Sequence, residues 1–73
     1  MKYWIQHDAD CPMAIRSAGD PFDDLDAVVE YWNAVSLKWI SDPNLALDMV
    51  WDPHIRDASK ADVQKLISAS AAA

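Results

Sequence analysis

Cysteine, glycine and basic residues are scarce in this chain, and each scarcity excludes something. With one cysteine, Cys11, the chain cannot form an internal disulfide, so its stability has to come from burying apolar side chains. One glycine is too few for a glycine-rich phosphate loop and leaves little material for shaping a cleft. No apolar run is long enough for a membrane span or a secretory signal, so we expect a soluble protein of the reducing cytoplasm.

Large apolar side chains are abundant instead. The 73 residues are 52% apolar and include four tryptophans, two tyrosines and one phenylalanine. A domain of this length buries only about 60% of its extended-chain surface, so each aromatic ring removed from water matters. We expect one globular domain over residues 1–73, with a fraying tail at 68–73.

Acidic residues outnumber basic ones twelve to six, and eleven of the twelve are aspartate. The net charge of −6 disfavours nucleic acid and anionic membranes as partners, because both would repel the chain. The excess is concentrated in residues 8–30, where Arg16 is the only base. The next base in the sequence is Lys38.

The first residues predict a β-hairpin. KYWIQH at 2–7 is aromatic and β-branched and has the alternation of a strand, and MAIRSA at 13–18 is the expected returning strand. The loop between them, 8–12, contains turn-forming aspartate and proline. A lone hairpin is rarely stable, so we expect this one to pack on helices.

Asp-Pro dipeptides at 20–21, 42–43 and 52–53 mark the joints of the remaining chain. Aspartate is a strong N-cap and proline suits the first helical position, so such a pair predicts a helix start. The first predicted helix begins at Asp20 and either ends near residues 33–36 or runs straight to Ile40. Its apolar face would consist of Leu25, Val28, Val29, Trp32 and Val35, with Phe22 at its edge.

Two further helices complete the predicted fold. One begins at Asp42 and Pro43 and runs to about Val50, where the third Asp-Pro pair ends it. The other covers 60 to about 70, because Ser59 and Asp62 have the spacing of a capping box. The prediction is therefore an α+β domain of order ββααα, with the hairpin packed on three helices.

Side chains that zinc accepts occur near the start of the chain and again farther along, at His7, Asp8, Asp10 and Cys11, and at Asp52 and His54. Their spacing lacks the paired CxxC or HxxxH pattern of a metal site, so we assign no metal ligands and no cofactor. Catalysis by the cysteine or a histidine would need a partner held within a cleft. We therefore expect a protein that is not an enzyme.

The aromatic residues divide into two groups. Trp32 and Trp39 fall on the apolar stripe of the first predicted helix and are expected in the core. Trp4 and Tyr31 are better candidates for exposure, on the opposite strand face and at the stripe's edge. Together with Leu37 they could form an exposed aromatic surface, which would suit an adaptor or a homodimer.

The acidic cluster is the main candidate site, and it comprises Asp20, Asp23, Asp24, Asp26 and Glu30. Helix formation explains the first three, as an N-cap and as partners of the helix dipole. It does not explain Asp26 and Glu30, a like-charge pair at i,i+4 that no nearby base relieves. An unrelieved acidic face suits a basic groove, so reversing these two to lysine should abolish binding and spare the fold.

The stretch DPFDDLDAVVE at 20–30, supported by HDAD at 7–10, resembles the small phage-encoded anti-CRISPR proteins that imitate DNA. The resemblance implies an inhibitor that blocks target-DNA or PAM binding by a Cascade-type complex in the host cytoplasm. The partner would be a basic nucleic-acid-binding protein, contacted by a monomer through the acidic cluster, with Asp8 and Asp10 assisting. The alternatives are the aromatic adaptor and an antitoxin that neutralises a basic toxin.

Overall fold

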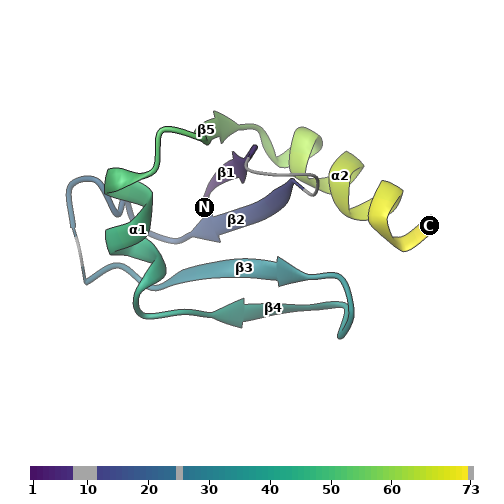
Figure 1. Ribbon diagram of the computed structural model, residues 1–73, viewed down its shortest axis with the longest axis horizontal. Coiled ribbons are helices and arrows are strands. Elements are labelled where there is room, and N and C mark those ends of the chain that lie inside the picture. Colours follow the sequence, from purple (N-terminus) through teal and green to yellow (C-terminus); the bar gives the residue numbers. More distant parts are fainter. Residues whose placement is uncertain (8–11, 25, 73) are drawn as a thin grey trace.

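Five strands form one antiparallel sheet in the order β4-β3-β2-β1-β5 (Figure 1). This is seen in a computed structural model that describes residues 1–7, 12–24 and 26–72. The strands are β1 (Lys2–Gln6), β2 (Met13–Ser17), β3 (Val29–Asn33), β4 (Lys38–Ser41) and β5 (Ile55–Ala58). Helix α1 (Leu45–Trp51) joins β4 to β5, and helix α2 (Lys60–Ala72) follows β5.

The predicted order ββααα is wrong, although the domain is a small α+β structure. In place of the first predicted helix lie a connection with turns in its described residues, 18–24 and 26–28, and the strands β3 and β4. The two expected helix ends, near 33–36 or at Ile40, are both wrong, because residues 34–37 form the turn between these strands. The strand segments are β-branched and aromatic, which suits a pleated surface.

The turn at 34–37 explains why the chain reverses there. The side-chain oxygen of Asn33 accepts hydrogen bonds from the backbone N–H groups of Val35, at 2.9 Å, and Ser36, at 3.1 Å. Leu37 adopts a left-handed conformation with φ 57°, and its N–H donates to the Asn33 carbonyl at 2.8 Å. Local side-chain bonding of this kind competes with a helix and favours a turn.

The predicted hairpin and the last helix are confirmed. Strands β1 and β2 pair from Lys2 opposite Ser17 to Gln6 opposite Met13. Ahead of α2, the Ser59 hydroxyl accepts from the Asp62 N–H at 3.0 Å, and the Asp62 carboxylate accepts from the Ser59 N–H at 3.2 Å. This reciprocal capping box satisfies two N–H groups that would otherwise lack a partner.

The Asp-Pro pairs at 42–43 and 52–53 lie at the two ends of α1, although α1 begins slightly later than predicted. α1 begins at Leu45, after Pro43, with Asn44 as its N-cap, and the Asp42 carboxylate accepts the Asn44 N–H at 2.9 Å. Asp52 and Pro53 end α1 as expected and then lead into β5, a strand that the sequence did not predict.

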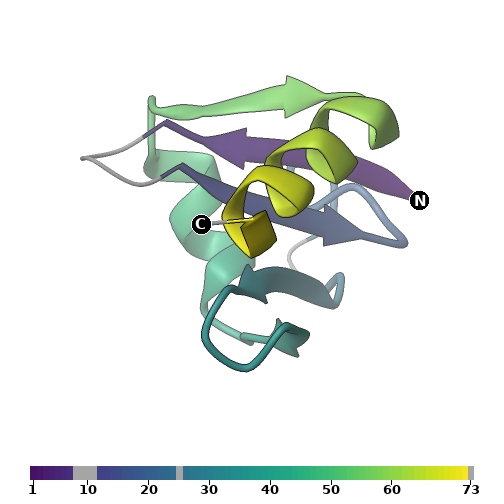
Figure 2. The same ribbon diagram turned by 90° about the vertical axis from the view of Figure 1, so that its right-hand side faces the viewer.

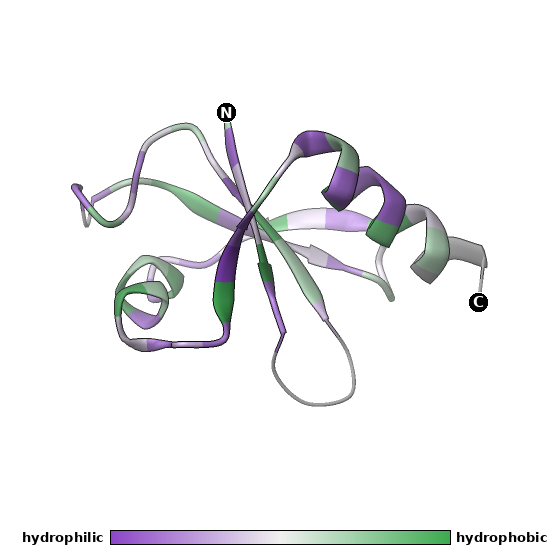
Figure 3. Ribbon diagram, turned by 90° about the horizontal axis from the view of Figure 1, so that it is seen from above, coloured by the Kyte–Doolittle hydropathy of each residue, from purple (hydrophilic) through white to green (hydrophobic). Residues whose placement is uncertain are grey.

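The two helices cover opposite faces of the sheet. Figure 2 shows α2 in front of the strands and α1 behind them, and in Figure 3 the strands pass between the two helices. The core lies on the α1 face and consists of Trp4, Ile15, Val29, Leu45, Ala46 and Met49. On the other face α2 packs on β1 and β2, where Ala14 and Val63 are buried.

This layering corrects the aromatic assignments. Trp4 is 3% exposed and belongs to the core, so its predicted exposure is wrong. Trp32 and Trp39 are only partly buried, because they lie opposite each other on β3 and β4, on the α2 face but away from the strands that α2 covers. Tyr31 lies at the margin of the core and Leu37 is exposed.

Two substitutions in α1 should separate its buried face from its exposed one. Met49→Ala should lower the free energy of unfolding by about 2–5 kcal/mol, because it leaves a cavity where a 1% exposed side chain packed. Leu47→Ala, at a position 52% exposed, should change it by less than about 0.5 kcal/mol. Urea unfolding of both variants measures the difference, and equal losses would contradict this packing.

Candidate partner-binding surface

Four of the predicted site residues lie in the connection between β2 and β3, residues 18–28, here called the acidic connection. The Asp20 carbonyl accepts from the N–H groups of Asp23 and Asp24, at 3.1 and 2.8 Å, and its carboxylate accepts from the Phe22 N–H at 3.0 Å. The Asp24 carboxylate accepts from the Asp26 N–H at 2.9 Å. Asp20 therefore starts a turn, as aspartate often does, and residues 21–24 and 26–28 contain no helix.

Two of the five clustered acids have counter-charges that the sequence order hid. Asp20 pairs with the ammonium of Lys2 at 3.3 Å, and Glu30 pairs with the guanidinium of Arg16 at 2.9 Å. Arg16 and Glu30 lie directly opposite each other on β2 and β3, and the guanidinium also lies 4.3 Å from the ring centroid of Trp39. The prediction of an unrelieved acidic helix face is therefore wrong, because the face does not exist and two of its members are paired.

The expectation that reversing Asp26 and Glu30 to lysine spares the fold changes as well. Glu30→Lys would place a second cation opposite Arg16, and like charges directly opposite in a sheet are destabilising. Glu30 is therefore a structural residue of the sheet.

Three carboxylates of the acidic connection have no cationic partner among the described residues. Asp23, Asp24 and Asp26 are exposed, and none of them takes part in an ion pair within residues 1–7, 12–24 and 26–72. Two apolar side chains stand out beside them, Phe22 at 50% exposure and Val28 at 66%. The surface is therefore acidic and apolar at once, a combination that a purely solvating segment does not need.

Asp8 and Asp10 lie outside the described residues, as does Leu25 of the predicted helix face. The strands that flank the two aspartates end at Gln6 and begin at Met13. Those strand ends lie at the opposite end of the sheet from Ser17, where the acidic connection begins.

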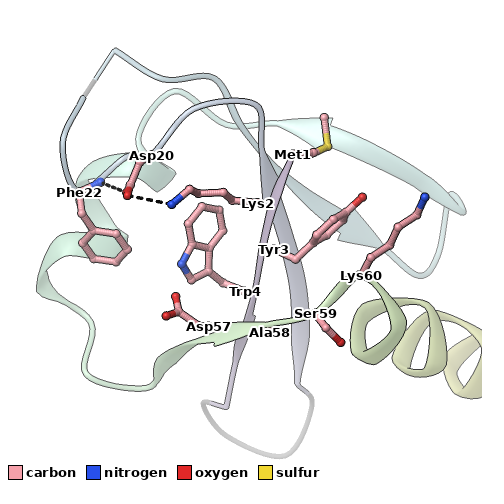
Figure 4. Close-up of a pocket in the computed structure, with 10 residues that line it drawn as sticks. All are labelled: Met1, Lys2, Tyr3, Trp4, Asp20, Phe22, Asp57, Ala58, Ser59 and Lys60. Carbon is pink, nitrogen blue, oxygen red and sulfur yellow. Dashed lines mark hydrogen bonds and ion pairs between the residues drawn. The ribbon is translucent and has the colours of Figure 1, made fainter.

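A cavity of about 820 Å³ opens at the end of the sheet where β1 starts and β5 ends (Figure 4). It lies between the acidic connection, which contributes Asp20 and Phe22, and strands β1 and β5. Trp4 and Asp57 line it from the strands. Asp57 was missed from the sequence because β5 was not predicted, so nothing placed it near the acidic connection.

A different exposed surface lies on α1. Leu47, Val50 and Trp51 occupy i, i+3 and i+4 positions and are 52%, 42% and 79% exposed. In Figure 3 most of α1 is coloured as hydrophobic. These residues, and not Trp4, are the exposed apolar set that an adaptor would use.

Three of the residues considered for metal binding, Asp52, His7 and His54, take part in hydrogen bonds around the start of β5. The Asp52 carboxylate accepts from the side-chain amide of Gln6 at 2.7 Å and from the His54 N–H at 2.8 Å. The His7 N–H donates to the His54 carbonyl at 2.8 Å. In the described part of the chain no three histidine, cysteine or acidic residues are grouped as a metal site requires, and Asp8, Asp10 and Cys11 lie outside it.

The hydrogen bonds to the Asp52 carboxylate lower its pKa. The backbone N–H of His54 and the side-chain amide of Gln6 hold the pKa of Asp52 below its ordinary value, outweighing the effect of desolvation. Asp52 thus links the end of α1 to β1 as an ionised group.

Comparison with protein-family models, with curated proteins and with solved structures found no match. Neither α1 nor α2 of the described chain has the length and apolar character needed to cross a bilayer.

Asp52→Asn should lower stability at neutral pH and lose this effect in acid. Because folding lowers the pKa of Asp52 from 3.8, the carboxylate contributes stability above that value, and the contribution is lost as pH falls through the lower folded pKa. Urea unfolding from about pH 7 to about pH 2 measures the gap between wild type and variant. Asp48→Asn is the control, and a gap that stays constant over this range would contradict the assignment.

Proposed function

We propose that this protein is a non-enzymatic binding protein that occupies the nucleic-acid site of a basic partner. The observation that carries the proposal is the row of exposed carboxylates at Asp23, Asp24 and Asp26, which have no ion-pair partner among the described residues. An unpaired anionic surface steers association with a basic groove and favours it over other surfaces.

The acidic connection is held at both ends, which favours binding over mere solvation. The buried Ser17 hydroxyl donates to the Val28 carbonyl at 3.0 Å and accepts the Gly19 N–H at 3.2 Å, so one side chain joins the start of the connection to its end. Pro21 is also buried. A segment restrained in this way loses less conformational entropy when it binds.

Exposed Phe22 and Val28 add apolar contact to the charge. Aromatic anchors within a polar surface are typical of protein interfaces, and a partner that covers Phe22 would remove a half-exposed ring from water. The combination supports a protein partner in particular, because free cations would be attracted by the carboxylates alone.

The resemblance to DNA-imitating anti-CRISPR proteins gives this proposal its specific form. The chain would act as a monomer in the host cytoplasm and block target-DNA or PAM binding by a Cascade-type complex. Asp23, Asp24 and Asp26 would replace backbone phosphates, whereas Asp20 and Glu30 already have cationic partners in Lys2 and Arg16. An antitoxin bound to a basic toxin would use the same three carboxylates, and the identity of the partner separates the two.

A second candidate function is an adaptor that docks through α1. The observation that favours it is Trp51, which is 79% exposed next to Val50 and Leu47. Such a contact would depend little on salt, whereas a contact through the acidic connection weakens as salt screens the charges.

The proposal is tested with Asp23→Asn/Asp26→Asn, which removes two charges and keeps the Asp24 carboxylate that accepts the Asp26 N–H. A purified Cascade-type complex is mixed with the chain, and target-DNA binding is followed by gel mobility shift. Wild type should inhibit, and the double variant should inhibit about tenfold less, a loss of about 1.4 kcal/mol. Raised salt should weaken inhibition by the wild type.

The matched control is Asp48→Lys, which changes the net charge by the same amount at a residue of α1 that is not part of the acidic connection. It should inhibit like wild type. Inhibition by the double variant at wild-type strength, or an absence of inhibition by the wild type, would overturn the proposal.

A further inference from the structure

We infer that the cavity beside the acidic connection binds one arginine side chain of the partner, with its guanidinium on Asp57 and against the exposed ring of Phe22, which packs on the buried Trp4 indole. This inference rests on the proposed function for the nature of the partner. The cavity itself, the position of the carboxylate and the position of the rings are independent of that function.

The sheet register brings the carboxylate and the indole together. Trp4 on β1 lies directly opposite Asp57 on β5, so both side chains emerge on the α1 face. Figure 4 shows Asp57 on β5 below the Trp4 indole, with the Phe22 ring to the left of both. A residue that the sequence separates from Trp4 by most of the chain thus becomes its neighbour.

The two rings form an apolar floor and wall. Phe22 and Trp4 have ring centroids 6.3 Å apart and planes tilted by 56°. Trp4 is almost fully buried, whereas Phe22 is 50% exposed and offers a ring to an incoming group. The electron-rich face of an aromatic ring attracts cations, and a guanidinium can also stack on it.

Asp57 has no ion-pair partner among the described residues that line the cavity. Asp20 already holds the ammonium of Lys2 at 3.3 Å, which shows that this cavity accommodates a cation on a carboxylate. Asp57 is exposed and takes part in no ion pair within the described residues. Its chain neighbour Arg56 points to the other sheet face by alternation, and Lys60 lies beside Tyr3, away from Phe22 (Figure 4).

These features favour arginine over other ligands. A guanidinium donates two parallel hydrogen bonds to a carboxylate while its flat face rests on a ring, which an ammonium cannot do. An anionic ligand such as a phosphate would meet both Asp20 and Asp57. Basic proteins that bind nucleic acid present arginines at the sites where phosphates and bases dock.

The test uses small probes and not the partner. Isotope-labelled full-length protein is titrated with N-acetylarginine methylamide, N-acetyllysine methylamide and N-acetylcitrulline methylamide, the last an uncharged analogue of nearly the same shape. Arginine should shift the Trp4 indole and Phe22 amide signals to saturation, lysine should bind more weakly, and citrulline should produce no saturable shift.

Asp57→Asn should weaken arginine binding about tenfold, through loss of the charged hydrogen bonds. Phe22→Leu should also weaken it, through loss of the ring. Asp48→Asn removes one carboxylate outside the cavity and should bind like wild type. Thermal unfolding of each variant confirms that it is folded.

Two results would overturn the inference: equal binding of arginine and citrulline, or wild-type arginine binding by Asp57→Asn. Because no partner protein is present, this outcome is separate from that of the inhibition assay. Arginine binding without inhibition would leave the cavity assigned and the proposed function wrong, and the reverse result would leave the function and remove the cavity.

Discussion

The antiparallel pairing of β2 with β3 is the constraint on which the rest of the structure depends. It places Ile15 opposite Tyr31 and Ser17 opposite Val29, so the centre of the sheet and the centre of the core are built by the same contacts. Once these strands pair, residues 18–28 have to form a connection at one end of the sheet. The segment that looks most helical by periodicity is thereby excluded from being a helix.

The same pairing redistributes the charge of the chain. Arg16 is brought opposite Glu30, and the start of β1 brings Lys2 to Asp20, so two acids that stand among other acids in the sequence acquire cations in space. Three of the five clustered acids remain without an ion pair among the described residues. Asp23, Asp24 and Asp26 lie on a restrained connection next to an exposed aromatic ring, and this combination is the basis of the proposed contact.

Both proposals concern one end of the sheet, where β1 begins and β5 ends. Long-range pairing of β5 with β1 adds Asp57 to this end, beside Trp4 and facing the acidic connection. The exposed apolar side chains of α1 would respond differently to salt, because apolar contact persists at salt concentrations that screen carboxylates. A single small domain therefore carries two surfaces whose contributions a salt series can distinguish.

Local chemistry in the sequence determined the end of α1 and the capping box of α2, since each depends on residues within a few positions of one another. The alternation within 2–7 and 13–18 likewise indicated the two strands of the hairpin. Val28, Val29 and Trp32 fit a helical stripe, yet VEYWN fits a strand equally well, and only pairing with β2 decides between them. The sequence left open whether Trp4 is exposed or buried, and the packing of α1 on its sheet face buries it. Tertiary structure also decided which carboxylates are free, because an ion pair depends on distance in space, and the partners of Asp20 and Glu30 are 18 and 14 residues away along the chain.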